Sequence, residues 1–336
     1  MKIFISIASY QDALLPVTIN SAYTQAKFKD NVFFGVIDQS KMKLDFSKSN
    51  IANQISYLHI DPADARGPCW ARAMAQTLMN DESYFLQIDS HTVFEKDWDE
   101  YLLNYLKIIK KNHSKPVISA YPRGFEVVDM EKRHFRKLQE NDDSTHVMVL
   151  DQDRVFKDGY FSMQKGIPTG SKEIYKGFLL SAGFIFSERN YVEEVPYDPH
   201  LYFEGEETTL ALRTFTNGYD IFHIPKTPLF HCYVSETDQF KRPLHWHADE
   251  EKDRKLKWDV FHKKSKSRIN NIIEGKLSGA YGLGSDRTIE DYRDISGIDI
   301  RNKKIVEEDS AFTFKKHLNN NWTNAKKKGS IFDVFK

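Results

Sequence analysis

The sequence has few cysteines and no long hydrophobic run, and these absences exclude several classes of protein. Its two cysteines, Cys69 and Cys232, lie far apart among 336 residues, which excludes a disulfide framework and zinc-knuckle spacing. No stretch approaches the roughly 18 consecutive apolar residues of a transmembrane helix. The first residues, MKIFISIASYQD, lack a cleavage site of small residues and are typical of a strand. We therefore expect a soluble, cytoplasmic protein in a reducing compartment.

The chain also lacks an excess of charge of either sign. Lys+Arg and Asp+Glu both number 48, so the net charge is zero, which argues against general binding of nucleic acid or an anionic membrane. The phosphate-binding fingerprints GxGxxG and GxxxxGK followed by Ser or Thr are missing. Apolar residues, at 40%, suffice for a sizeable core. Abundant aromatic residues fill such a core and can also line carbohydrate or nucleotide clefts.

The first 120 residues alternate between strand and helix patterns. This alternation predicts a mostly parallel sheet with right-handed crossover connections. The expected strands are residues 2–8, 31–38, 55–60, 84–89 and 116–120, and the expected helices are residues 13–27, 66–80 and 98–110.

The remainder of the chain is less regular. Residues 121–176 are polar and predict an excursion with one or two strands, and residues 177–186 predict a strand with an internal glycine. Gly218 is expected to end a helix at the position where left-handed glycines are common. From about residue 250 the chain is charged and helical, and its last stretch predicts an exposed tail or a frayed helix. The other expected elements are a helix at 206–217, strands at 219–224 and 229–233, and a helix near 286–293.

A possible metal site follows the strand at residues 84–89. The apolar run ends in Asp89, Ser90 and His91, and side chains two apart on an extended segment point the same way. Oxygen and nitrogen ligands at the carboxyl edge of an open α/β sheet suit a divalent metal. The structural alternative is a helix N-cap aspartate beside a surface histidine.

His231 is a candidate third ligand, because it follows an apolar strand, in the segment PLFHCY, in the second half of the chain. Alone, such a residue is more often a packed or surface histidine. Together with Asp89 and His91, it would leave open positions for two phosphate oxygens. An octahedral site of oxygen and nitrogen ligands suits Mn²⁺ or Mg²⁺ better than a closed zinc site.

Polar residues also follow the other expected strands, where a nucleotide could use them. Tyr10 could stack on a base, and Asp38 could accept a hydrogen bond from a ribose or a base. Arg66 and Arg72 could neutralise a pyrophosphate. Each has a structural alternative, since Asp38 could be a turn residue and the arginines could lie on a helix surface. Their joint placement at successive strand ends favours a functional role.

The segment FEGEE opens the helix expected at 206–217. Glutamates in a first helical turn stabilise the helix dipole, so Glu206 and Glu207 could be capping residues. They could also recognise sugar hydroxyls, and Gly183 could let the backbone approach a sugar closely. A glycosidase pair is disfavoured, because its two carboxylates face each other across the scissile bond and adjacent helix residues do not.

With these segments in view, the chain resembles two families of nucleotide-sugar glycosyltransferases. IASYQD, ARGPCWAR, FLQIDSH and GLGSDRTIEDYRDISGIDI resemble glycosyltransferase family 60, the Skp1-type polypeptide α-N-acetylglucosaminyltransferases and their bacterial relatives. The DSH sequence followed by EKDWDEYLL resembles the polypeptide N-acetylgalactosaminyltransferases. So does the order Arg66, Asp89-Ser90-His91, Gly183, Glu206, Arg213, His231. The resemblance covers about residues 2 to 300.

The resemblance implies a GT-A fold, which is an α/β, Rossmann-like architecture with a mostly parallel central sheet. The catalytic domain would span residues 1–248, with a nucleotide-binding half at 1–120 and a sugar and acceptor half at 177–233. Residues 249–336 would form a helical extension and tail.

The resemblance also implies a UDP-sugar donor, Mn²⁺ or Mg²⁺, and retention of the anomeric configuration. A lid would order over the diphosphate. The implied residues are Asp89, His91 and His231 on the metal; Ala8, Ser9, Tyr10 and Asp38 on uridine; Arg66, Arg72 and Asp89 near the uracil or diphosphate; Gly183 and Glu206 on the donor sugar; Glu206 and Glu207 as catalytic candidates; and Lys241, Arg242, His245 and Trp246 in the lid.

The sequence therefore predicts a retaining, metal-dependent transferase that moves a sugar, first of all GlcNAc, to a hydroxyl of a polypeptide or glycan. Front-face attack would need no strong protein base, whereas double displacement would use Glu206 or Glu207 as nucleophile. The alternatives are a metal-dependent sugar-nucleotide hydrolase and a non-catalytic sugar- or nucleotide-binding module.

Overall fold

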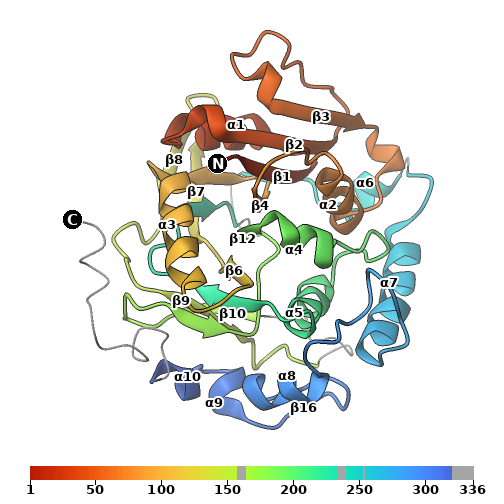
Figure 1. The fold of residues 1–336 in the computed structure, drawn as a ribbon. Coiled ribbons are helices and arrows are strands. Elements are labelled where there is room, and N and C mark those ends of the chain that lie inside the picture. Colours follow the sequence, from red (N-terminus) through yellow and green to blue (C-terminus); the bar gives the residue numbers. More distant parts are fainter. Residues whose placement is uncertain (157–163, 234–239, 253, 320–336) are drawn as a thin grey trace.

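The fold is built on one large sheet and several small ones (Figure 1). The computed structural model describes residues 1–156, 164–233, 240–252 and 254–319. The large sheet has the order β11-β13-β6-β12-β4-β1-β2-β3, and a second sheet has the order β5-β14-β7-β8. The strands are β1 (Ile3–Tyr10), β2 (Val32–Gln39), β3 (Ile55–Ile60), β4 (Tyr84–Asp89), β5 (Thr92–Phe94), β6 (Pro116–Ser119), β7 (Arg123–Asp129), β8 (His134–Lys137), β9 (His146–Leu150), β10 (Gln164–Pro168), β11 (Tyr175–Gly177), β12 (Phe184–Glu188), β13 (Asp220–His223), β14 (Leu229–His231), β15 (Ile298–Asp299) and β16 (Lys304–Ile305).

Helices cover both faces of the large sheet. They are α1 (Leu15–Gln25), α2 (Pro68–Gln76), α3 (Trp98–Lys110), α4 (Arg189–Glu194), α5 (Glu206–Thr216), α6 (Ala248–Glu251), α7 (Trp258–Ile273), α8 (Ile289–Ser296), α9 (Glu308–Ala311) and α10 (Lys315–Leu318). The alternation of β1 shows how the layers form, because successive side chains of a strand point to opposite faces. Ile5 packs in the core layer that contains α1 and α3, whereas Phe4 packs in the layer that contains α5 and α8.

The predicted α/β architecture is confirmed, and its first half agrees closely with the sequence pattern. The strands at 55–60 and 84–89 and the helix at 98–110 have the predicted bounds. Parallel pairings join β3, β2, β1 and β4, and another joins β6 to β13, while β12 and β11 run antiparallel to their neighbours. Gly218 follows α5 with φ +80°, as expected for a helix terminator.

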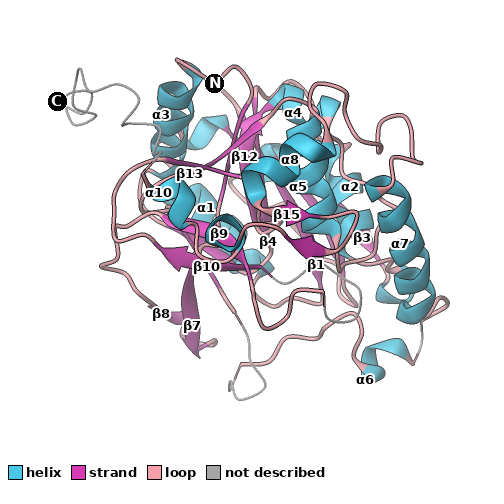
Figure 2. Ribbon diagram, turned by 90° about the horizontal axis from the view of Figure 1, so that it is seen from below, coloured by secondary structure: helices cyan, strands magenta, loops and turns pink. Residues whose placement is uncertain are grey.

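Three predicted elements differ from the structure. Residues 121–176 hold four complete strands, β7 to β10, rather than one or two, and β7 and β8 form a hairpin that extends from the body (Figure 2). The strand expected at 177–186 begins only at Phe184, because Ala182 donates its backbone N–H to Glu207 Oε1 (2.7 Å) instead of to a neighbouring strand. The helix expected from residue 66 starts at Pro68, since Gly67 adopts φ +94°.

The C-terminal part packs against α5 rather than standing apart. Ile269, Ile272 and Ile273 of α7 are buried in the same core cluster as Leu212 and Phe215 of α5. The boundary predicted at residues 248 and 249 stays a prediction. The predicted tail from residue 320 lies outside the described residues. None of the helices described is long and apolar enough to cross a bilayer.

Candidate functional site

The two sheets meet at Asp89, His91 and His231. Asp89 ends β4, whose neighbour β1 is parallel and pairs Ala8 with Asp89. The chain turns at Ser90 and continues as β5, and β14 pairs antiparallel with β5 so that His231 lies opposite Thr92. Residues 142 positions apart, Asp89 and His231, are thereby brought into contact. The sheet pairing therefore explains how this triad assembles.

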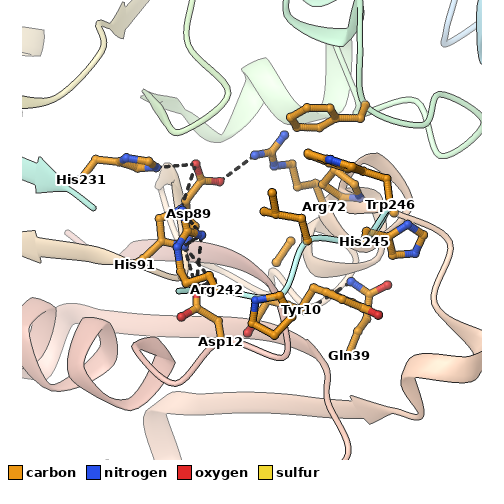
Figure 3. Close-up of a pocket in the computed structure, with 18 residues that line it drawn as sticks. Tyr10, Asp12, Gln39, Arg72, Asp89, His91, His231, Arg242, His245 and Trp246 are labelled. Atoms are coloured by element: carbon orange, nitrogen blue, oxygen red, sulfur yellow. Dashed lines mark hydrogen bonds and ion pairs between the residues drawn. The ribbon is translucent and has the colours of Figure 1, made fainter. Parts of the chain in front are cut away.

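The triad has the geometry of a metal-binding cluster. One potential ligand atom from each of Asp89, His91 and His231 lies within 4.8 Å of the others. His231 Nε2 lies 3.1 Å from Asp89 Oδ2, and His91 Nε2 lies 3.9 Å from the same oxygen. Figure 3 shows Asp89 between the two imidazoles on one side and Arg72 on the other.

The charge states of the triad suit a cation. Burial acts to raise the pKa of Asp89, but Arg72 and the two histidines outweigh it and hold the pKa well below its usual range. Burial, followed by the neighbouring His91, lowers the pKa of His231 to about 4. A carboxylate and a neutral imidazole are the forms that bind a metal.

Asp12 was not predicted, yet it orients His91. Its Oδ2 lies 2.7 Å from His91 Nδ1 and also accepts a hydrogen bond from Ser90 Oγ. Burial raises the pKa of Asp12, but His91, Arg242 and Ser90 together lower it to about 2. Because a carboxylate only accepts, Nδ1 carries the proton and the Nε2 lone pair faces the cluster. The residue lies within the IASYQD segment, although no spacing rule marked its role.

Arg72 is held between two carboxylates rather than standing free at the cavity wall. Its Nη2 donates to Asp89 Oδ1 (2.7 Å), and its Nη1 donates to Glu206 Oε1 (2.6 Å) and Tyr197 Oη (3.0 Å). The arginine is 4% exposed, so these ion pairs are shielded from water. Arg72 therefore holds Asp89 in place, in addition to the role on the pyrophosphate that the sequence predicted for it.

Glu206 is fully engaged at the other end of this network. Its Oε2 accepts from Tyr197 Oη (2.7 Å) and from Cys69 Sγ (2.8 Å), while Oε1 pairs with Arg72. Burial and the adjacent Glu206 raise the pKa of Cys69 well above its usual range. With both oxygens occupied, Glu206 is placed to hold Arg72 in position.

Glu207 turns in another direction from its neighbour. Oε2 accepts from Tyr121 Oη (2.8 Å) and Gln164 Nε2 (2.5 Å), and Oε1 accepts from Ala182 N (2.7 Å). All three donors are neutral. Burial and the neighbouring Glu206 raise the pKa of Glu207 to about 7, so its charge changes near neutral pH.

Two adjoining cavities share Asp89, His231, Arg72 and Phe203 in their walls. The first cavity, about 250 Å³, is lined by Ala8, Ser9, Tyr10, Gln39 and the residues 242–246. The second cavity, about 390 Å³, is lined by Gly183, Glu206, Glu207, Tyr121 and Gln164. The triad therefore lies at the junction of two spaces that could hold two parts of one ligand.

Gly183 gives the second cavity its close approach to Asp89. A Cβ at this position would lie 2.9 Å from Asp89 Oδ2, so any larger residue would displace the carboxylate or the backbone. The sequence predicted a glycine that permits close contact with a sugar. The structure shows that its lack of a side chain already serves Asp89.

Ala8, Ser9 and Tyr10 lie in the first cavity wall as the sequence suggested. Tyr10 is fixed from outside the sheet, since its hydroxyl donates to Glu250 (3.0 Å) and accepts from Arg254 (2.8 Å). Its ring edge packs against His245, with centroids 5.0 Å apart.

Asp38 and Arg66 are not brought into the first cavity. Asp38 accepts from Tyr57 Oη (2.8 Å) and Ser40 Oγ (2.9 Å), and the next residue, Gln39, lines the cavity instead. The neighbour on a strand points to the opposite face, which explains the exchange. Arg66 is exposed and lies over the Trp70 ring at 5.4 Å, because Gly67 turns the chain before α2 begins.

The predicted lid contributes three of its four named residues to the first cavity. Arg242, His245 and Trp246 line it, whereas Lys241 does not, and residues 234–239 lie outside the described chain. Arg242 Nη1 lies 3.0 Å from His91 Nε2, and Trp246 packs on Phe203 with centroids 4.9 Å apart. Figure 3 shows Trp246 and His245 across the cavity from Asp89.

The donor set of the triad suits a divalent metal ion. It combines one carboxylate with two imidazoles, and Arg72 and Asp12 orient the carboxylate and one of the rings through hydrogen bonds. The Nε2 atom of His91 now faces Arg242, so this guanidinium must move before the lone pair can bind a cation.

Comparison with solved structures shows a glycosyltransferase fold of the GT-A type. A structure of GalNAc-T7 with UDP, GalNAc and Mn²⁺ has a TM-score of 0.54 at 13% identity, covering 87% of this chain and 54% of that one. The chain thus spans about half the length of that protein. Two structures of S. aureus TarS have TM-scores of 0.42 and 0.40 at 15% and 14% identity, covering 70% and 66% of this chain and 37% and 60% of those.

No curated protein sequence matches the chain. The family model described as Glycosyltransferase (GlcNAc) matches residues 42–302, which is more than half of the chain and includes the triad, both glutamates and the residues 242–246. The chain belongs to this family of glycosyltransferases.

Proposed function

We propose that this protein transfers N-acetylglucosamine from UDP-GlcNAc to a hydroxyl group, with retention of configuration and with Mn²⁺ or Mg²⁺ as cofactor. The observation that carries the proposal is the Asp89, His91 and His231 triad at the junction of two cavities. The family description names GlcNAc, and the GalNAc-T7 structure of similar fold contains UDP and Mn²⁺. These names supply the sugar, the nucleotide and the metal of the proposal.

The first cavity would hold UDP. Ala8, Ser9 and Tyr10 end β1 beside it, and Gln39 would take the place that the sequence gave to Asp38. A divalent ion bound by the triad would neutralise the charge that develops on the departing diphosphate. Arg242 also lines the first cavity, and we place it on a phosphate when it leaves His91.

The second cavity would hold the donor sugar and the attacking hydroxyl. Gly183, Glu206 and Glu207 line it. Because both oxygens of Glu206 are engaged, we propose that it positions Arg72 and Asp89 and orients the sugar, as front-face attack requires. Glu207 also has both oxygens engaged, but by neutral hydroxyl and amide donors, and we propose that from this fixed position in the second cavity wall it contacts the acceptor hydroxyl or the sugar.

The acceptor that fits the Skp1-type resemblance is a polypeptide hydroxyl, and a glycan hydroxyl is the other class. Incubation with UDP-GlcNAc and Mn²⁺, on arrays of peptides and glycans, tests both. We expect UDP release that rises with acceptor and stops with a chelator. UDP release that no acceptor stimulates would establish a hydrolase instead, and UDP binding that ignores metal would favour a binding module.

A donor comparison tests the sugar. The rates at which UDP-GlcNAc, UDP-GalNAc and UDP-glucose are consumed are compared at equal donor concentration. UDP is used as the same competing ligand in each assay. We expect UDP-GlcNAc to be consumed fastest by at least about tenfold, which corresponds to about 1.4 kcal/mol of discrimination. Equal rates with all three donors would contradict the proposed specificity for GlcNAc but not the proposed transfer reaction.

A further inference from the structure

A third cavity lies outside the two that adjoin the triad, and it has the character of a binding site. We call it the basic hollow; its volume is about 610 Å³. Its wall comes from the segment before α2, from the turn at residues 199–201 and from α7. The residues of α7 that line it are Phe261, Lys264, Ser267, Arg268 and Asn271, and successive positions three and four apart place them on one helix face.

The charges of the basic hollow are all positive. Arg66, Lys264 and Arg268 line it, and no carboxylate of the described residues does. Arg268 is partly compensated, since its Nε donates to the buried Asp198 (2.6 Å). Arg66 and Lys264 are exposed, and neither is within ion-pair distance of a carboxylate in the described parts of the chain. Two uncompensated cations flanking a concave surface attract an anion.

The hollow also offers aromatic and apolar surface. Trp70 lies beneath Arg66, with the guanidinium 5.4 Å from the ring centroid, and Phe261 stacks on Tyr202 at 6.0 Å and 10°. Leu256 is 47% exposed at the rim. Flat rings pack against the C–H faces of sugar rings, and guanidinium groups pair with carboxylate or phosphate. This combination favours a charged sugar chain over a peptide of similar charge.

The hollow lies against the same two segments that wall the first cavity. Arg66 lines the hollow, while the next residues, Gly67 and Pro68, line the first cavity. Leu201 lines the hollow, and Phe203 lines both the first and the second cavity. The hollow and the first two cavities are therefore lined by neighbouring residues of the same two segments. A chain bound in the hollow would lie beside the proposed positions of the sugar and the metal.

We propose that the basic hollow binds the acceptor, and that the acceptor is a glycan bearing negative charges. The proposal rests on the transferase function proposed above, and it narrows the acceptor to one class. Arg66, which the sequence assigned to the nucleotide, would then serve the acceptor, together with Lys264 and Arg268.

Direct binding tests the hollow without depending on catalysis. Calorimetry of the full chain, without donor or metal, compares a galacturonic acid hexamer with its methyl ester and with hexaglutamate. We expect the charged hexamer to bind at least about tenfold tighter than the neutral ester and the peptide, with affinity falling as salt rises. Equal binding of the ester, or tighter binding of the peptide, would overturn the proposal.

Charge reversal locates the binding. Lys264→Glu and Arg66→Glu should each lower the affinity for the galacturonic acid hexamer by at least about fivefold. Lys263→Glu, one position away on α7 but outside the hollow, should change this affinity less than twofold. UDP affinity should be unchanged in all three, because none of these residues lines the first cavity. An equal loss in Lys263→Glu would mean non-specific attraction and would overturn the site. If the wild-type protein bound the hexamer but cleaved no UDP-GlcNAc, the transferase proposal would fail and the hollow would stand.

Discussion

Two carboxylates in the cavity walls, Asp89 and Glu207, are both partly buried but differ in their protonation. Arg72 forms an ion pair with one oxygen of Asp89 and His231 lies within hydrogen-bond distance of the other, and together they hold the pKa of Asp89 well below its usual range. Neutral donors surround Glu207, and burial with the adjacent Glu206 raises its pKa to about 7.

The difference teaches that burial alone does not fix the charge of a side chain. Burial favours the neutral acid in both cases, and only at Asp89 do Arg72 and the two histidines reverse its effect. Asp89, in the walls of both cavities, thus stays an anion that suits a metal, whereas Glu207, in the second cavity, is an acid that titrates near neutral pH. The predictions below test this contrast, from the largest expected effect to the smallest.

Removing the permanent anion should have the largest effect. Asp89→Asn keeps the size of the side chain but removes the charge that pairs with Arg72 and orients the triad. We expect transfer to fall by about 10³-fold or more, and metal-dependent UDP binding to be lost. The matched control is Asp38→Asn, another buried carboxylate at a strand end, which bonds Tyr57 outside the first cavity. Near wild-type turnover in Asp89→Asn would contradict the metal site.

Removing the cation should destabilise the fold itself. Arg72→Met leaves Asp89 and Glu206 as two buried carboxylates without a shared partner. We expect the free energy of unfolding to fall by about 3–5 kcal/mol, which urea denaturation measures. Arg66→Met, at an exposed position, should change it by less than about 0.5 kcal/mol. Equal effects of the two changes would mean that the ion pairs of Arg72 add no more to the free energy of unfolding than an exposed arginine does.

Glu207→Gln should change the pH dependence of stability. Since the pKa of Glu207 is raised to about 7 in the folded protein, its proton is bound more tightly there than in the unfolded chain. That contribution is full below the unfolded pKa, near 4.5, and is lost as pH rises through about 7. The variant should therefore gain on the wild type by about 2 kcal/mol between pH 5 and pH 8. The exposed Glu204→Gln serves as control, and parallel stability curves would contradict the shift.

Arg242→Ala should have the smallest effect, on metal affinity. Its guanidinium lies 3.0 Å from His91 Nε2 and must leave before that lone pair can bind a cation. Without UDP, we expect the variant to bind Mn²⁺ about three- to tenfold more tightly, as titration calorimetry would show. With UDP the advantage should disappear, because the phosphate loses a cationic partner. Weaker Mn²⁺ binding in both states would place Arg242 in support of the triad.

The sequence predicted well where side-chain pattern alone decides. Strand β4 and helix α3 have the predicted bounds, because apolar runs and helical periodicity are local signals. The triad was predictable in part, since the DSH sequence follows an apolar strand. The pairing of β14 with β5, which brings His231 to the other two, depends on the whole sheet.

The features of the site that the sequence did not predict depend on the conformation or orientation of single residues. Gln39, rather than Asp38, lines the first cavity, because neighbours on a strand face opposite ways and a pattern shows only where the strand ends. Gly67 turns the chain at φ +94° and sends Arg66 outward, although helical periodicity predicted a helix from residue 66. Asp12 has a conformation-dependent role and no spacing to reveal it.

The thiol of Cys69 gives the molecule a built-in probe of opening. Cys69 is wholly buried beneath Glu206, and its raised pKa leaves almost no thiolate, which is the species that reacts with alkylating agents. In the closed protein, alkylation of this thiol should therefore wait for the Arg72 and Glu206 network to separate. Its rate would then report, from one atom, how often the wall between α2 and α5 opens and whether UDP slows that motion.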